Sequence, residues 1–170
     1  MELITGILLG LSTLLFIGPV FFYLIKTTLE EGFWAGISVT LGIILGDIIY
    51  VFLVVEGFSS FLDNDRYNKW FALLGGILLL FIGLKYIFTE MLRSQFLKST
   101  STNSLGVYAL KGFLLNFLNP FVLAVWIGFY SINQTKFESK SSILLSLIVT
   151  LMVIFTTDCL KVVFANNLKP

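Results

Sequence analysis

One aspartate lies inside a long apolar stretch of this 170-residue chain, where an acidic side chain is rare and costly. Asp47 lies between Gly46 and Ile48, and no Lys or Arg lies within one helical turn of it. An ionised carboxylate in hydrocarbon costs about 2.5–3.5 kcal/mol on insertion scales, so the protonated form is favoured. Such a group suits a proton carrier or a site for a substrate ammonium. The structural alternative is a carboxyl that only hydrogen-bonds between helices.

A second aspartate, Asp158, lies in another apolar stretch and has Lys161 three residues further along the chain. Residues at i and i+3 of a helix lie on one face, so Lys161 can neutralise Asp158. Asp158 is therefore either a functional acid or half of a structural ion pair, and the sequence leaves both interpretations open.

Two prolines interrupt apolar stretches, at Gly18-Pro19 and at Asn119-Pro120. Proline removes a backbone donor and clashes with the preceding turn, so each one predicts a kink or break in a helix. In a membrane protein, two matched breaks can free carbonyls and amides to line a cavity. The alternative is an ordinary kink, which transmembrane helices tolerate.

Two asparagines, Asn116 and Asn119, are spaced by one helical turn beside the second break and are expected to share a face. Their amides can bind a polar solute or satisfy backbone groups at the break. Together these considerations predict a substrate or ion site formed by Gly18, Pro19, Asp47, Asn116, Asn119, Pro120 and Asp158.

The composition indicates which elements must position these residues. Hydrophobic residues make up 57% of the chain and charged residues 12%, against roughly 25% charged residues in soluble domains. The mean hydropathy is +0.95. A soluble domain cannot bury so much apolar surface, and runs of roughly 20 apolar residues recur. The chain is therefore predicted to be an all-α membrane protein with one transmembrane domain over residues 1–170. The five expected spans cover residues 3–28, 33–55, 70–88, 107–132 and 142–165.

Missing residue types exclude several kinds of chemistry. The chain has no His and a single Cys, Cys159, which excludes Ser-His triads and paired-thiol redox centres. We find no nucleophile–base pair, so no catalytic residue, metal site or cofactor is predicted, and the protein is not expected to be an enzyme. The net charge is +1 without a dense basic cluster, so nucleic acid is not an expected partner.

Lys and Arg are distributed unequally between the two sides of the five expected spans. Cytoplasmic loops carry an excess of these residues, which places the richer side in the cytoplasm and the N-terminus outside. The poorer side holds Arg66, Lys69, Lys136 and Lys140, and the richer side holds Lys26, Lys85, Arg93, Lys98, Lys111, Lys161 and Lys169.

The two halves of the chain share a pattern, over residues 3–88 and 107–165. Each half has a proline-interrupted helix followed by a helix with one buried Asp. Three helices separate equivalent positions, so the second half enters the membrane from the opposite side. This inverted-repeat plan is typical of secondary transporters, whose sites lie near the midplane at broken helices. The helix at 70–88 has no later counterpart, so we expect a truncated 3+3 bundle of six helices, or a homo-oligomer in which a second copy fills the groove.

Glycines four residues apart recur in the expected spans. Such small-xxx-small pairs predict close packing of helices, and they occur at Gly6/Gly10, Gly32/Gly36 and Gly42/Gly46.

Three segments together resemble the LysE-type amino-acid exporter family: TLGIILGDIIY at 40–50, Gly18-Pro19, and GFLLNFLNP at 112–120. The resemblance implies a bacterial inner-membrane exporter of amino acids or related small solutes, built from about six helices and driven by an ion gradient. The sequence departs from the family's usual Pro-Gly-Pro and Asn-Pro-Lys motifs at Ile17 and Phe121.

The predicted function is a secondary transporter that exports an amino acid or similar small solute, coupled to protons. Its expected partners are that small molecule and the lipid bilayer. A metal-cation exporter ranks lower because soft metals lack His and Cys ligands here. A non-transporting membrane scaffold, in which the buried acids are structural, is the alternative from a different class.

Overall fold

A computed structural model of the chain describes residues 1–57 and 104–168, and every element in these ranges is a helix. The expected all-α membrane architecture is confirmed by these helices and their apolar length. The expected span at 70–88 lies outside the described residues.

The first span is broken, as the proline predicts. Helix α1 (Glu2–Ser12) continues into the short 3₁₀ helix η1 (Thr13–Leu15), and α2 (Pro19–Glu31) follows at an angle of 75°. Pro19 is the first residue of α2, where its missing N–H costs nothing, and Gly18 before it is extended. The proline therefore starts a new helix instead of bending one.

The fourth expected span is broken in the same way. Helix α7 (Leu105–Phe117) and helix α8 (Pro120–Lys136) meet at 65°. The Asn119 side chain accepts a hydrogen bond from the backbone N–H of Phe121 at 3.1 Å, so it caps the first turn of α8. Asn116 and Asn119 consequently lie on either side of a break, and the expectation that they share one helical face is wrong.

The other two expected spans within the described residues are not broken by a proline. Helix α3 (Phe33–Phe52) ends in a π-helical turn, η2 (Leu53–Gly57), and helix α9 (Lys140–Asn167) is the longest described helix. Both are long and apolar enough to cross a membrane singly. Counting each bent pair as one span gives up to four spans among the described residues.

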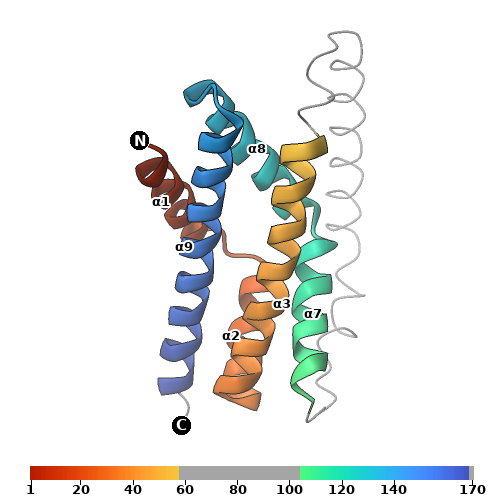
Figure 1. Cartoon of the computed structure of the whole chain (residues 1–170). Helices are drawn as coiled ribbons and strands as arrows, with labels where there is room; N and C mark the ends of the chain where they lie inside the picture. Colours follow the sequence, from red (N-terminus) through yellow and green to blue (C-terminus); the bar gives the residue numbers. More distant parts are fainter. Residues whose placement is uncertain (58–103, 169–170) are drawn as a thin grey trace.

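The two broken helices run in opposite directions. In Figure 1 the pair α1 and α2 descends from the N-terminus at the top, while α7 and α8 ascend from the bottom. Helix α3 then ascends and α9 descends to the C-terminus. The two breaks lie at intermediate height, between the two ends of the bundle.

Glycines bring two pairs of helices close together. Helix α3 packs most extensively on α7, and α1 packs most extensively on α9. A Cβ at Gly42 would overlap the Ala109 carbonyl of α7, and Cβ atoms at Gly6 and Gly10 would lie 2.7 and 2.6 Å from the Cβ atoms of Val149 and Val153. Close packing at Gly6/Gly10 and Gly42/Gly46 is therefore confirmed.

The third glycine pair, Gly32/Gly36, combines a turn residue with a packing residue. Gly32 has φ of 99° and forms the turn between α2 and α3, a backbone conformation that a side chain disfavours. Gly36 provides close packing, because a Cβ there would overlap the hydroxyl of Thr28 and press on Val162.

The buried apolar residues form two clusters at different heights of the bundle. One gathers Trp126 and Leu147 with the end of α3, and the other gathers Leu24, Val39 and Val162. Members of both clusters border the cavity that contains the predicted site residues.

Candidate functional site

A cavity of about 780 Å³ lies where the two broken helices meet α3 and α9. It is lined by residues of α2, α3, α7, α8 and α9, together with both breaks. The cavity brings together all seven residues that the sequence singled out, from positions up to 140 residues apart: Gly18, Pro19, Asp47, Asn116, Asn119, Pro120 and Asp158.

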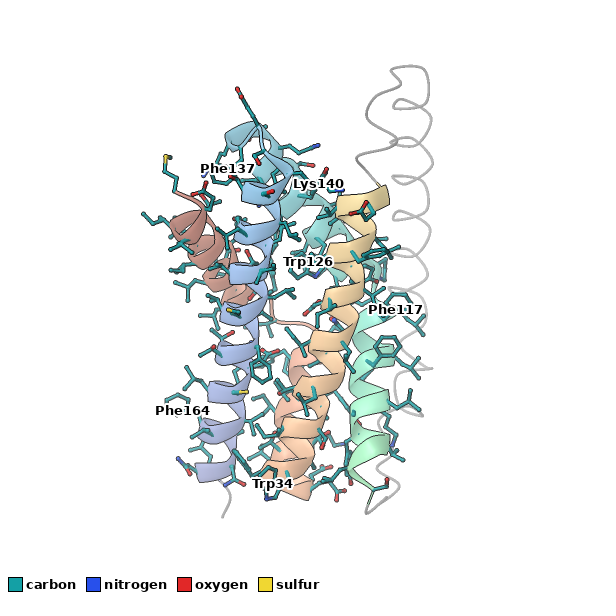
Figure 2. All side chains as sticks on the ribbon, viewed as in Figure 1. Trp34, Phe117, Trp126, Phe137, Lys140 and Phe164 are labelled. Carbon is teal, nitrogen blue, oxygen red and sulfur yellow. The ribbon has the colours of Figure 1, made fainter. Side chains whose placement is uncertain are left out.

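Asp47 is held by two donors from other helices. Its side chain is only 3% exposed. Its Oδ1 accepts one hydrogen bond from Asn116 Nδ2 and another from Trp126 Nε1, each at 2.9 Å. Figure 2 shows Trp126 between the ribbons of α9 and α3, above the level of the break. The carboxylate of α3 is thus fixed by α7 on one side and by α8 on the other.

Asn116 joins α7 to α3 at two points. Its Nδ2 also donates to the Ile43 carbonyl at 2.9 Å, one turn before Asp47. Gly46 makes room for this amide, because a Cβ at Gly46 would lie 3.0 Å from Asn116 Nδ2. The absence of a side chain at Gly46 therefore allows Asn116 to reach the Asp47 carboxylate.

The backbone groups freed at the second break are partly satisfied by side chains. The Tyr50 hydroxyl donates to the Phe117 carbonyl at 2.6 Å, at the end of α7. Asn119 caps α8, so its side chain satisfies a backbone group at the break. Asn116 instead donates to the Asp47 carboxylate.

Asp158 and Lys161 form the ion pair that their spacing predicts. Lys161 Nζ lies 2.7 Å from Asp158 Oδ1, and the side chains are 21% and 10% exposed respectively. Nζ also lies 5.8 Å from the centroid of the Phe21 ring, a distance at which a cation is attracted to an aromatic face. Both members of the pair line the cavity that contains Asp47.

The beginning of α2 differs from that of α8. The cap residue of α2 is Gly18, and no side chain of the described residues caps its first turn, whereas Asn119 caps α8. Pro19 and Val20 of that turn line the cavity. The first turn of a helix carries partial positive charge, so this end of the cavity attracts anionic groups.

Trp126 was missed by sequence reasoning, although a signal was available. Tryptophans are enriched at the two interfaces of a membrane, whereas Trp126 falls well inside the span at 107–132. A second feature missed is the edge-to-face pair of Phe16 and Phe121, whose ring centroids are 5.3 Å apart. Both rings line the cavity, so the pair links the two breaks at its wall.

Lys161 occupies a different place from the one the topology argument gave it. That argument counted Lys161 among the cytoplasmic cations, but the structure places it in the cavity. Four of the seven residues counted there (Lys85, Arg93, Lys98 and Lys169) lie outside the described residues, as do Arg66 and Lys69 on the opposite side. The orientation of the chain therefore stays a prediction.

Within residues 1–57 and 104–168, no group of three or more His, Cys, Asp or Glu side chains is arranged to hold a metal ion. The acids that face the cavity there are Asp47 and Asp158.

Comparison with known proteins identifies the family of this chain. The family model described as "LysE type translocator" matches residues 11–168. The chain belongs to the LysE type translocator family. The resemblance noted from three sequence segments is thereby confirmed, and with it an integral membrane protein of a transporter family.

One curated relative of this LysE-type chain comes from Bacillus subtilis (strain 168) and is described as "Putative amino acid efflux protein YcgF". It is 27% identical over 124 residues, which cover 73% of this chain and 59% of the relative. The chain thus matches less than two thirds of that relative's length. No solved structure matches the chain.

Proposed function

We propose that this protein is a secondary transporter that exports amino acids, or solutes of similar size and charge, across the bacterial inner membrane. The observation that carries the proposal is the cavity at the two helix breaks, with Asp47 held on its wall by Asn116 and Trp126. Membership of a translocator family and a relative described as an efflux protein support the direction of transport.

The charges around the cavity suit a zwitterionic solute. A free amino acid carries an ammonium and a carboxylate a few ångströms apart. Asp47 offers a carboxylate with no ion-pair partner among the described residues, and the uncapped first turn of α2 offers partial positive charge. The cavity therefore has an acidic place and an electropositive place on the wall of one volume of about 780 Å³.

Proton coupling is proposed from the chemistry of Asp47, a buried carboxylate that has no ion-pair partner among the described residues. A carboxylate in a low-dielectric site needs a positive partner, which is either a proton or the solute's ammonium. If Asp47 carries one or the other, each solute released on one side is exchanged for a proton taken up there. This exchange makes the proton gradient the source of energy for export.

An inverted repeat provides the two access states. A two-fold axis in the membrane plane would exchange α1 with α7, α2 with α8, and α3 with α9. It would also exchange the packing of α3 on α7 with that of α1 on α9, and these are the two most extensive helix contacts. The opposite directions of the two broken helices support the same symmetry (Figure 1). Rocking of one repeat (α1, α2 and α3) against the other (α7, α8 and α9) would open the cavity alternately to each side of the membrane.

The proposal is tested by efflux from proteoliposomes loaded with labelled amino acids under an imposed pH gradient. We expect gradient-driven efflux from the native protein and its loss in Asp47→Asn, which keeps the size but cannot titrate. Glu138→Gln, a change of the same kind at an exposed position, is the matched control. A native protein that moves no amino acid, with or without the gradient, would favour the scaffold alternative.

A further inference from the structure

We infer that the solute is a zwitterionic α-amino acid with a bulky apolar side chain, and that Lys161 binds its carboxylate while Asp47 binds its ammonium. This inference rests on the proposed transport function and narrows its substrate class. Three features of the cavity carry it: the number of charges on the wall, the position of Lys161, and the apolar character of the remaining wall.

The charges on the wall match one ammonium and one carboxylate. The charged residues among the described lining are Asp47, Asp158 and Lys161. Asp158 is already engaged by Lys161 at 2.7 Å, which leaves Asp47 to receive a cation. A basic amino acid would bring a second cation without a free acid to meet it. An acidic one would bring a second carboxylate without a second cation.

Lys161 is placed to bind an anion without leaving Asp158. An ammonium has three N–H donors, and Lys161 donates one hydrogen bond to Asp158 Oδ1. Its Nζ lies over the ring of Phe21, the third residue of α2. The lysine therefore sits beside the uncapped first turn of α2, so its charge and the helix dipole favour a carboxylate at the same place.

The rest of the wall is largely apolar. It includes Phe16 and Phe121 at the two breaks, with Val122, Val125, Phe129 and Ile154 beyond them. The polar side chains at the breaks are engaged locally, because Thr13 donates to the Gly10 carbonyl at 2.6 Å and Asn119 caps α8. A leucine-like or phenylalanine-like side chain gains contact here, whereas a polar side chain would lose its water without finding a partner.

Efflux from proteoliposomes tests the class directly. Vesicles are loaded with labelled leucine, phenylalanine, lysine or glutamate, and leucine efflux is measured against competing leucine or against 3-methylbutylamine, which lacks the carboxylate. We expect leucine and phenylalanine to leave fastest and the amine to compete about ten- to a hundredfold more weakly than leucine, as for loss of one charged hydrogen-bonding partner.

Variants of Lys161 separate recognition from structure. Lys161→Met should reduce the difference between leucine and the amine to about twofold or less, because both ligands then lack the cation. The double variant Asp158→Asn with Lys161→Met should do the same without leaving a lone buried charge, and Lys161→Arg should retain the preference. Lys111→Met, on α7 and away from the cavity lining, is the matched control.

The outcomes that overturn the inference are distinct from failure of the proposed function. Faster efflux of lysine or glutamate than of leucine overturns the substrate class and leaves an amino-acid exporter. An unchanged preference for leucine over the amine in the double variant overturns the role of Lys161. Absence of efflux for every amino acid overturns the proposed function itself.

Discussion

Trp126 Nε1 lies 2.9 Å from Asp47 Oδ1, so a tryptophan near the end of the second turn of α8 holds the acid of α3. The indole is 1% exposed and packs edge-to-face on Phe129 at 5.7 Å between centroids. Because α8 is one arm of a broken helix, any movement of that arm changes the surroundings of the carboxylate. This hydrogen bond therefore makes the surroundings of the Asp47 carboxylate depend on the position of α8.

Replacing Trp126 tests this connection. Trp126→Phe keeps most of the apolar packing but removes the donor to Asp47. A hydrogen bond to a charged group is worth about 1.5–3 kcal/mol, so we expect gradient-driven efflux to fall by about tenfold or more. Efflux from proteoliposomes measures the effect. Trp34→Phe, at a position 68% exposed, should transport at the native rate.

Gly46 should be intolerant of even a methyl group. A Cβ in Gly46→Ala would lie 3.0 Å from Asn116 Nδ2 and push the amide away from Asp47. We expect efflux to fall severalfold while the protein still inserts. Gly128→Ala is the matched control, since nothing lies within 4 Å of a Cβ there. Equal activity of the two variants would contradict a role for the Asn116–Asp47 bond.

Gly42 should matter to stability more than to recognition. A Cβ in Gly42→Ala would overlap the Ala109 carbonyl, so α3 and α7 must separate. Overpacking of this kind costs about 1–3 kcal/mol. We expect a lower melting temperature in detergent, read by tryptophan fluorescence. Gly106→Ala, whose Cβ would make only an ordinary contact at 3.8 Å with Ser104, should melt like the native protein.

The Asp158–Lys161 pair should show strong coupling. Asp158→Asn leaves the Lys161 ammonium without its partner in a poorly solvated site, and loss of one member of a buried pair costs about 3–5 kcal/mol. The double variant with Lys161→Met removes both charges and should be more stable than Asp158→Asn alone. Denaturation in a mixed-micelle series measures the free energy of unfolding of the native protein, the two single variants and the double variant, which together form a double-mutant cycle. Additive effects would indicate that the pair is not coupled.

The orientation of the chain is tested by single cysteines in a Cys159→Ser background. The predicted outside N-terminus places the α8–α9 connection outside as well, because both lie at the same end of the bundle (Figure 1). Glu138→Cys should therefore react with an impermeant thiol reagent in intact cells. Glu30→Cys, near the opposite end, should react only after permeabilisation, and the reverse pattern would invert the topology.

The sequence by itself determined the class of the protein and the places where its helices break. An apolar stretch of about 20 residues predicts a membrane span from the local sequence alone. The reason is that a helix of that length satisfies its own backbone hydrogen bonds in lipid. Pro19 and Pro120 start α2 and α8 for an equally local reason, the missing N–H and the fixed φ. The ion pair of Asp158 and Lys161 was predictable because one helical turn separates the two residues.

Only the tertiary structure decided what surrounds Asp47. Its partners Asn116 and Trp126 lie 69 and 79 residues away along the chain, and they reach it because α7 and α8, the two arms of one broken helix, both contact α3. Nor does glycine spacing distinguish packing from turning: Gly42/Gly46 meets a helix, whereas Gly32 forms a turn. Periodicity identifies the face of a helix, but which neighbour that face meets depends on contacts between distant segments.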